Sequence, residues 1–302
     1  MNKIAISTQT YRADFEECKL LCKSIDAFVP SYIPHYIFVN DEDYDFFKKS
    51  NFFKDRKIYK KSDLLPRYLI GIHKKILGHQ YYFSPITIPV REWIIQQICK
   101  LSVFDIIDRD IDAVINIDSE VVFLKPFNVN LFSKDNKYLL FKELFKEEPN
   151  HFDYCKIGKK ILNLSQEQNT IDKYCYQSAS VVFVRENLLQ LHNQIRNYSF
   201  FKSWKLKLCN TYRFSEYYLY GLFNDYIYND KNHFITNQRP FPMIDLSNST
   251  PQSFKNDIIK IKENSKVQGV WLQKHQRNNK NMHLLSFENI EKIINQCIFN
   301  TI

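Results

Sequence analysis

The pattern of apolar and polar positions at the start of the chain predicts a strand, a helix and a second strand. Residues 3–8 alternate in character, and apolar side chains then recur at helical spacing after Asp14. Asp14 lies three residues before Glu17, the spacing of a capping box. Residues 35–39 (HYIFV) form an apolar run that ends at polar residues, which is typical of a buried strand. This order favours an α/β fold with a mostly parallel sheet.

The rest of the chain continues the alternation of strands and helices. Apolar runs predict further strands at residues 56–61, 113–117, 121–124, 137–141, 180–184 and 267–272. Helical spacing predicts helices at residues 92–101, 186–198, 210–228 and 286–297. Residues 68–90 and 245–265 show no clear pattern. Because no linker or repeat interrupts the chain, we expect one domain over residues 1–302, with a mixed, mostly parallel central sheet flanked by helices.

Composition and charge indicate an ordinary globular protein. Hydrophobic residues make up 44% and charged residues 25% of the 302 residues, which excludes extensive disorder. The seven cysteines match no zinc-binding pattern, so we expect free thiols in a reducing cytoplasm. The net charge of +9 favours anionic partners, but the sequence has no dense block of basic residues. The basic surface is therefore either only solvated, or it contacts a membrane or an anionic substrate. Without a signal peptide or a spanning apolar run, we expect a cytoplasmic protein, with peripheral contact at the inner membrane as an option.

The clearest candidates for chemistry are two carboxylates that follow the strand predicted at residues 113–117. Asp118 and Glu120 lie two positions apart, so extended backbone would direct both to the same side. Such carboxylates repel each other and favour a cation between them, and their hard oxygen atoms suit Mg²⁺ or Mn²⁺, which binds diphosphates. In open α/β sheets, ligands bind beyond the carboxyl ends of the strands. The alternative is two exposed acids in a turn.

The segment at residues 116–126 (NIDSEVVFLKP) resembles the D-x-D motif of glycosyltransferases with the A fold. More narrowly, five segments in the expected order resemble one bacterial family of surface-polysaccharide glycosyltransferases: TQTYRADFEECKLLCKS (8–24), VNDEDYDF (39–46), EWIIQQICKL (92–101), DSEVVFLKP (118–126) and FSEYYLYGLF (214–223). The resemblance implies a Rossmann-like A fold in which residues 1–127 bind a nucleotide sugar. Residues 128–302 would then bind the acceptor and supply a C-terminal lid. Glu120 stands where aspartate is usual, and its longer side chain still suits a metal ion.

The resemblance also implies which residues bind the donor. Thr8, Thr10, Tyr11 and Asp14 follow the first strand and would lie near the base and ribose. Tyr11 is suited to stack on a uracil ring. Alternatively, Tyr11 covers the sheet edge and Asp14 only caps the helix.

Three further residues would contact the donor sugar or diphosphate, namely Gln97, Lys100 and Ser119. Lys100 offers a point charge for phosphate. The alternative for Gln97 and Lys100 is a solvated helix face. Trp93, on the same predicted helix, is expected in the core.

Two regions of the second half complete the predicted site. Near the C-terminus, His275 would be a third metal ligand, and Lys274 would neutralise the departing diphosphate within a polar lid at residues 273–283. A lone histidine is otherwise structural or exposed. Glu216 would be the acceptor-side carboxylate, acting with Asp118 in catalysis as the base of an inverting enzyme or as an orienting group in a retaining one. Alternatively, Glu216 is a first-turn glutamate that the helix dipole favours.

These features predict a glycosyltransferase that uses Mn²⁺ or Mg²⁺ and transfers a sugar from a nucleoside-diphosphate sugar to a saccharide acceptor. The resemblance favours a UDP-linked donor. It also favours an acceptor that belongs to capsule or other surface-glycan synthesis. A sugar-phosphate nucleotidyltransferase shares the strand-end carboxylates but usually has a glycine-rich N-terminal loop, which this sequence lacks. A basic nucleic-acid-binding protein needs exposed aromatic residues among basic ones, and we expect no nucleic-acid partner. A transferase-like scaffold without activity is a further alternative, suggested by Glu120.

Overall fold

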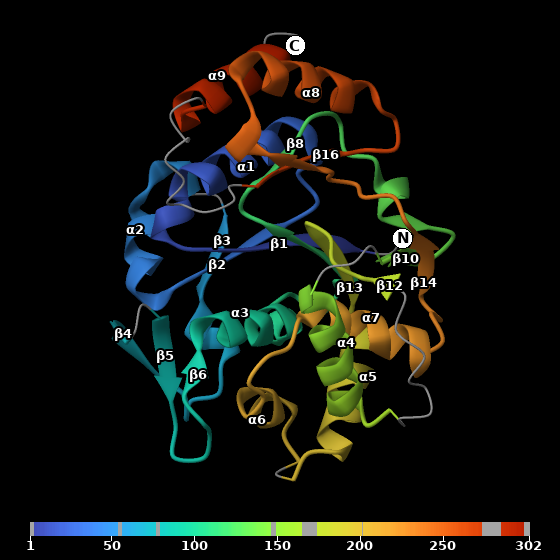
Figure 1. Ribbon diagram of the computed structural model, residues 1–302. Coiled ribbons are helices and arrows are strands. Elements are labelled where there is room, and N and C mark those ends of the chain that lie inside the picture. Colours follow the sequence, from blue (N-terminus) through green and yellow to red (C-terminus); the bar gives the residue numbers. More distant parts are fainter. Residues whose placement is uncertain are drawn as a thin grey trace.

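The computed structural model describes residues 3–53, 56–76, 79–145, 149–164, 174–200, 202–273 and 285–298. At its centre is a five-stranded sheet in the order β13-β7-β1-β2-β3 (Figure 1). All neighbouring strands are parallel except β13, which runs antiparallel to β7. The strands are β1 (Ile4–Thr10), β2 (His35–Val39), β3 (Lys57–Lys60), β7 (Ala113–Asp118) and β13 (Ser180–Val184). The predicted α/β class with a mostly parallel central sheet is therefore confirmed.

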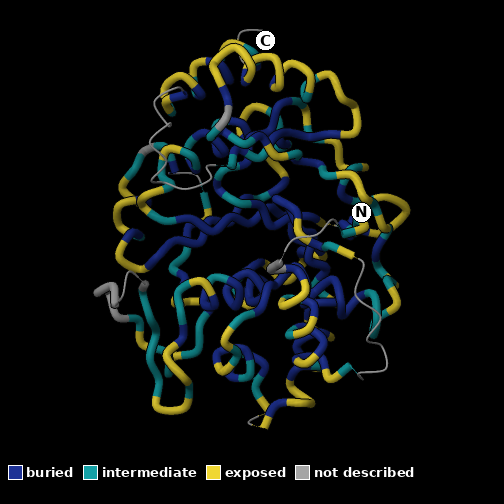
Figure 2. Tube along the Cα trace, viewed as in Figure 1, coloured by how far each residue is buried: buried dark blue, intermediate teal, exposed yellow. Residues whose placement is uncertain are grey.

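Helices cover both faces of this sheet, so both faces are buried (Figures 1 and 2). Alternate residues of a strand face opposite sides, and in β1 Ile4 and Ile6 belong to one core cluster whereas Ala5 belongs to another. The first face packs against α1 (Phe15–Phe28) and α2 (Tyr44–Lys49). The second face packs against α3 (Glu92–Leu101), α4 (Pro149–Leu162), α5 (Arg185–Asn197), α6 (Trp204–Cys209) and α7 (Glu216–Tyr226).

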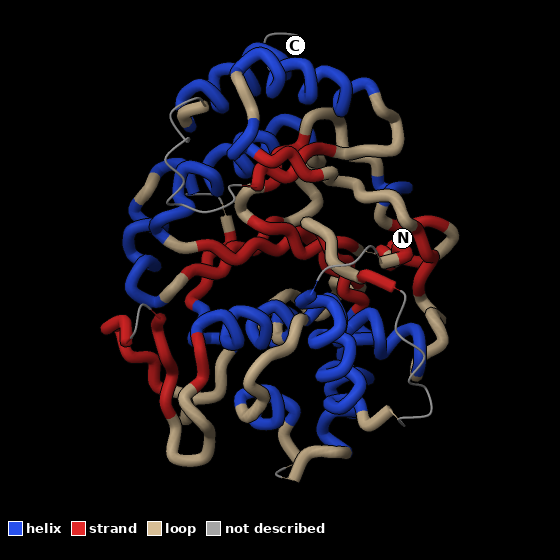
Figure 3. Tube along the Cα trace, viewed as in Figure 1, coloured by secondary structure: helices blue, strands red, loops and turns tan. Residues whose placement is uncertain are grey.

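In the part of the chain that the structure describes, four small sheets surround the central one (Figure 3). The unpatterned stretch at residues 68–90 holds one of them, made of β4 (Ile70–Ile76), β5 (His79–Phe83) and β6 (Val90–Arg91). A second consists of β15 (Met243–Asp245), β16 (Gly269–Gln273) and β8 (Val121–Phe123). The others contain β9 (Ser133–Lys134), β10 (Lys137–Phe141) and β14 (His233–Thr236), and β11 (Glu143–Leu144) with β12 (Tyr174–Cys175).

The C-terminal helices α8 (Pro251–Glu263) and α9 (Phe287–Ile298) form an outer layer that packs on β8 and β16 (Figure 1). The apolar pattern of residues 245–265 did not predict α8. Its start carries a clear signal, because the side chains of Thr250 and Ser253 form a capping box and Pro251 opens the helix. Among the described helices, none has the length and apolar character that crossing a membrane requires. All seven cysteines lie in the described part of the chain, and none forms a disulfide.

Two helix starts differ from the prediction. Asp14 precedes α1 but its side chain makes no capping hydrogen bond. The reason is that Arg12–Asp14 already form a 3-10 turn, which places Asp14 at φ −104° and ψ 22°, outside the extended geometry of a capping residue. The tyrosine-rich helix begins at Glu216 and not at residue 210, because residues 210–215 are not helical and Ser215 has extended backbone geometry.

The order of the strands defines where a ligand is expected. The chain runs from β1 outward to β2 and β3, and then returns to β7 on the other side of β1. Crevices at such a switch point, beyond the carboxyl ends of the strands, are the usual ligand sites of open α/β sheets. At that end of the sheet Gln9 and Asp118 are register partners on the neighbouring strands β1 and β7.

Candidate active site

A cavity of about 400 Å³ lies at this switch point. Most of the residues predicted to act on a donor or acceptor line it, namely Tyr11, Asp14, Gln97, Lys100, Asp118, Ser119, Glu120 and Glu216. They come from the end of β1, from α3, from the β7–β8 connection and from the start of α7. The fold therefore brings together side chains that lie more than 200 positions apart in the sequence.

Four predicted residues are not placed in this cavity. Thr8 is buried in β1, where its Oγ1 lies 3.0 Å from Nε2 of His35. Thr10 is also buried, and neither threonine lines the cavity. Lys274 and His275 lie outside the described residues, as does most of the lid predicted at residues 273–283.

Gln9 lines the cavity, whereas its predicted neighbours Thr8 and Thr10 do not. The sequence did not mark Gln9 as a candidate. Only 5% of the residue is exposed, and neither its amide nitrogen nor its amide oxygen has a hydrogen-bond partner in the described structure. An unsatisfied buried amide costs about 1–3 kcal/mol, so its retention is best explained by a ligand that satisfies it. The alternation along β1 is the signal that would have found Gln9, because residues 8 and 10 must face the other way.

We expect Gln9→Leu to stabilise the free protein by about 1 kcal/mol and to weaken binding of a nucleotide ligand. The substitution places an apolar side chain of similar size at this position and removes an unsatisfied amide, but it also removes the groups that a ligand would bind. Urea unfolding and ligand-induced thermal shifts measure the two effects. Gln252→Leu on α8 is the matched control, because the Gln252 amide donates to Asn256 at the surface. A less stable free Gln9→Leu protein would contradict this interpretation.

Lys100 connects the two predicted catalytic carboxylates. Its Nζ lies 3.1 Å from Oδ1 of Asp118 and 2.9 Å from Oε1 of Glu216. It also donates a hydrogen bond to the hydroxyl of Tyr217 at 3.1 Å. Gln97 and Lys100 are only 4% and 5% exposed, so the alternative of a solvated helix face is wrong for both.

Burial and charge shift the pKa of Lys100, and that of Glu216, in opposite directions. Burial lowers the pKa of Lys100, but Asp118 and Glu216 outweigh it and hold that pKa well above its usual range. Burial raises the pKa of Glu216 although Lys100 opposes the shift. Oε2 of Glu216 has no hydrogen-bond partner in the described structure, and the residue lines the cavity. One carboxylate oxygen is thus paired with Lys100, while the other is buried beside the cavity without a hydrogen-bond partner among the described residues.

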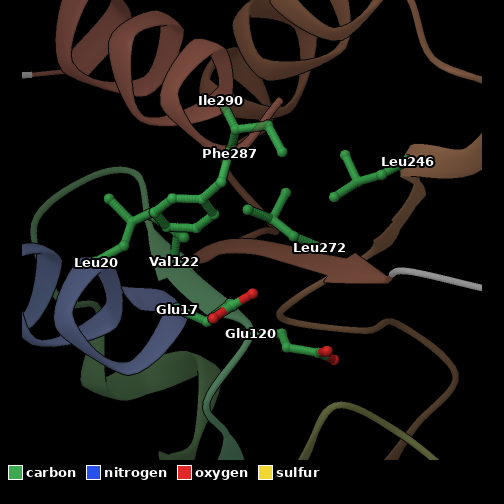
Figure 4. A pocket seen from close by; sticks show the side chains of 8 residues that line it. All are labelled: Glu17, Leu20, Glu120, Val122, Leu246, Leu272, Phe287 and Ile290. Atoms are coloured by element: carbon green, nitrogen blue, oxygen red, sulfur yellow. The ribbon is translucent and has the colours of Figure 1, made fainter. Parts of the chain in front are cut away.

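Glu120 lies between the cavity and a small apolar pocket. Residues 119–120 form a turn, so the shared direction of the carboxylates does not come from extended backbone as predicted. Figure 4 shows the carboxylates of Glu17 and Glu120 beneath apolar side chains that include Leu20 and Leu272. Nε1 of Trp271 donates to Oε2 of Glu120 at 3.4 Å. Burial, and then the charge of Asp118, raises the pKa of Glu120 to about 7.

This pKa predicts a pH dependence of stability in the absence of metal. Because folding raises the pKa of Glu120 from 4.5 to about 7, its contribution is complete below pH 4.5 and is lost as the pH rises through 7. Glu120→Gln should therefore flatten the decline of the urea midpoint between pH 5 and pH 8, measured with a chelator present. An identical slope in the wild type and the variant would contradict the shifted pKa.

A divalent cation that is shared with a substrate stays a prediction for this cavity. Among the described residues, no group of three or more histidine, cysteine or acidic side chains is placed to hold a metal ion. Mg²⁺, however, is commonly bound by one or two carboxylates together with substrate phosphates. The cavity walls contribute four carboxyl groups and the ammonium of Lys100, so an anionic ligand would be repelled there unless a cation accompanied it. Asp118 and Glu120 both line the cavity and stay the predicted protein ligands of such a cation.

Trp93 lies at this cavity and not in the core, so the prediction for it was wrong. It is 40% exposed and lines the cavity together with Gln96, Gln97 and Lys100. These residues are spaced i, i+3, i+4 and i+7, so they form one face of α3. The tryptophan belongs to that face and not to the apolar stripe of Ile94, Ile95 and Ile98.

A second cavity of about 460 Å³ adjoins the first, and Gln177, Ser178 and Trp271 line both. Glu143 and Arg239, which form an ion pair, also line the second cavity. The sequence analysis did not identify these residues, which carry no recognisable motif. Together the cavities provide adjacent spaces for two ligands.

Comparisons with known proteins give the following results. Among solved structures, one that is similar to this chain is the galactosyltransferase LgtC in complex with donor and acceptor sugar analogues. The sequence identity is 10% and the TM-score is 0.49, and the match covers 97% of this chain and 95% of that chain. None of the curated proteins matches the sequence. The profile of DUF6492, a family of unknown function, matches residues 3–268. The chain therefore belongs to the DUF6492 family.

Proposed function

We propose that this protein is a glycosyltransferase that transfers a sugar from a nucleoside-diphosphate sugar to a saccharide acceptor. The observation that carries the proposal is the Asp118–Lys100–Glu216 arrangement at the switch point of the sheet, in which Lys100 and Glu216 are buried and Glu120 lies beside them. A cavity of about 400 Å³ falls within the range of small-molecule sites, about 300–1,000 Å³. The five ordered segments that resemble bacterial A-fold transferases support the same activity.

In this proposal the donor lies along β1, α3 and the β7–β8 turn. Tyr11 and Asp14 contact the base and ribose, and we favour uracil because of the resemblance. Gln9, Gln97 and Ser119 offer polar groups to the sugar and the diphosphate.

Asp118 and Glu120 would hold Mn²⁺ or Mg²⁺, which would neutralise the charge that develops on the leaving diphosphate. Beyond the described residues, His275 stays a proposed third ligand and Lys274 a proposed phosphate contact. Lys100 fixes the orientation of Asp118 and Glu216 through its two ion pairs.

The acceptor is proposed to enter from the second cavity, which adjoins the first along Gln177 and Ser178. Glu216 would then accept the proton of the attacking hydroxyl or orient that hydroxyl. A growing capsule or other surface glycan is the acceptor class that the sequence resemblance favours. Such an enzyme would work in the cytoplasm, next to the inner membrane.

Thermal unfolding with a panel of UDP-, GDP-, CMP- and dTDP-sugars tests this proposal, with Mn²⁺ and with chelator. A ligand that binds only the folded state at one hundred times its Kd stabilises that state by about 2.7 kcal/mol. We expect a metal-dependent increase in Tm with one nucleotide and its loss in Asp118→Ala. Asp110→Ala is the matched control, because Asp110 pairs with Lys3 at the surface. No shift with any donor in folded, metal-loaded protein would reject a nucleotide-sugar site.

A further inference from the structure

Two aromatic rings form a supported stack beside the donor cavity. The centroids of Trp93 and Tyr154 lie 5.9 Å apart with an interplanar angle of 29°. Tyr154 also packs against Tyr218 at 5.5 Å and beneath the guanidinium of Arg213, whose Cζ lies 4.9 Å from the ring centroid. Trp93 is 40% exposed, so its indole is the accessible layer of a stack that is fixed from within. Both rings line the cavity.

The face of α3 that carries Trp93 changes in chemical character along its length. Trp93 stands at one end, the amides of Gln96 and Gln97 follow, and Lys100 stands at the other end among carboxylates. Seven residues correspond to about 10 Å along a helix axis. An aromatic face suits the apolar C–H face of a pyranose ring, and amides both donate and accept hydrogen bonds with its hydroxyls.

We propose that Trp93 and Tyr154 form the acceptor subsite, and that it selects an uncharged pyranose. This inference rests on the proposed function, which places the diphosphate at Asp118, near Lys100. The ring attached to that diphosphate occupies the Lys100 end of α3, so the next ring, that of the acceptor, occupies the Trp93 end. The carboxyl groups of Asp14, Asp118, Glu120 and Glu216 line the same cavity and repel an acidic sugar. The charge of Arg213 beside the stack is met by Asp153, whose Oδ2 lies 3.3 Å from Nη1 of the guanidinium.

The test measures saccharide binding by calorimetry or saturation-transfer NMR at saturating UDP and Mn²⁺. The probes are the neutral disaccharides lactose, maltose and cellobiose, together with an acidic hyaluronan tetrasaccharide. We expect at least one neutral disaccharide to bind, Trp93→Ala to weaken it about tenfold, and Trp93→Phe to retain most of the affinity. Tyr32→Ala is the aromatic control, since Tyr32 is 81% exposed and lines neither cavity.

The affinity for UDP with Mn²⁺, measured separately, should be the same in the wild type and in Trp93→Ala. Equal saccharide binding by both proteins, a preference for the acidic tetrasaccharide, or binding of UDP without any neutral disaccharide would overturn the subsite. The subsite would also be overturned if Trp93→Ala weakened the binding of a UDP-sugar but not the binding of UDP, because the stack would then hold the donor sugar. Failure of UDP and of every other nucleotide in the thermal panel to bind would instead reject the proposed function.

Discussion

Lys100→Met is expected to lower the free energy of unfolding by about 3–5 kcal/mol at pH 8. The substitution keeps the length of the side chain but leaves the carboxylate of Glu216, which is 1% exposed, without its compensating charge. The loss should be smaller at pH 5. An unpaired buried carboxyl has a raised pKa, so its protonated form stabilises the fold at low pH and that contribution is lost as the pH rises. Urea unfolding at both pH values measures the difference.

A second substitution distinguishes lost charge compensation from lost packing. Adding Glu216→Gln to Lys100→Met neutralises the unpaired carboxylate and should restore most of the stability at pH 8, which a double-mutant cycle quantifies. Lys19→Met is the surface control, because Lys19 pairs with Glu16 on an exposed face of α1 and should cost at most about 1 kcal/mol. A Lys100→Met protein that is as stable as the wild type would show that the ion pair does not hold these elements together.

The sequence predicted the parts of this site that local patterns encode. Asp118 and Glu120 follow an apolar strand, so their position at the carboxyl end of the sheet follows from hydrophobic patterning alone. The pairing of Lys100 with Glu216 does not, because it joins α3 to α7 across 116 positions and depends on tertiary packing. The sequence marked both residues as candidates, through the family resemblance, without relating them to each other.

Other errors of prediction came from signals that were present but were given too little weight. The alternation of β1 excludes Thr8 and Thr10 from the face that Gln9 occupies. The spacing of Trp93 with Gln97 and Lys100 places it on the polar face of α3, although tryptophan is usually buried. In both cases the period of the element was a better guide than the type of residue.

The loss of catalysis in Glu216→Gln should be the largest effect on turnover, about 100-fold or more, with donor binding retained. Oε1 is paired with Lys100, so we expect Oε2 to be the atom that accepts a proton or a hydrogen bond from the acceptor hydroxyl. Glutamine keeps the shape of the side chain but cannot act as a base. Release of nucleoside diphosphate from the donor that the thermal panel identifies measures the rate, and the thermal shift with that donor measures binding.

The pH profile separates a base from a residue that only orders the site. Because burial raises the pKa of Glu216, a base in this position gives wild-type turnover that rises with pH above the ordinary range of a glutamate. The residual rate of Glu216→Gln should lack that rise. Glu186→Gln is the control, since Glu186 accepts hydrogen bonds from Tyr228 and Asn232 away from the cavity and should leave turnover unchanged. A slow Glu216→Gln enzyme that keeps the wild-type pH profile would assign Glu216 to orienting the substrate, as a retaining transferase requires.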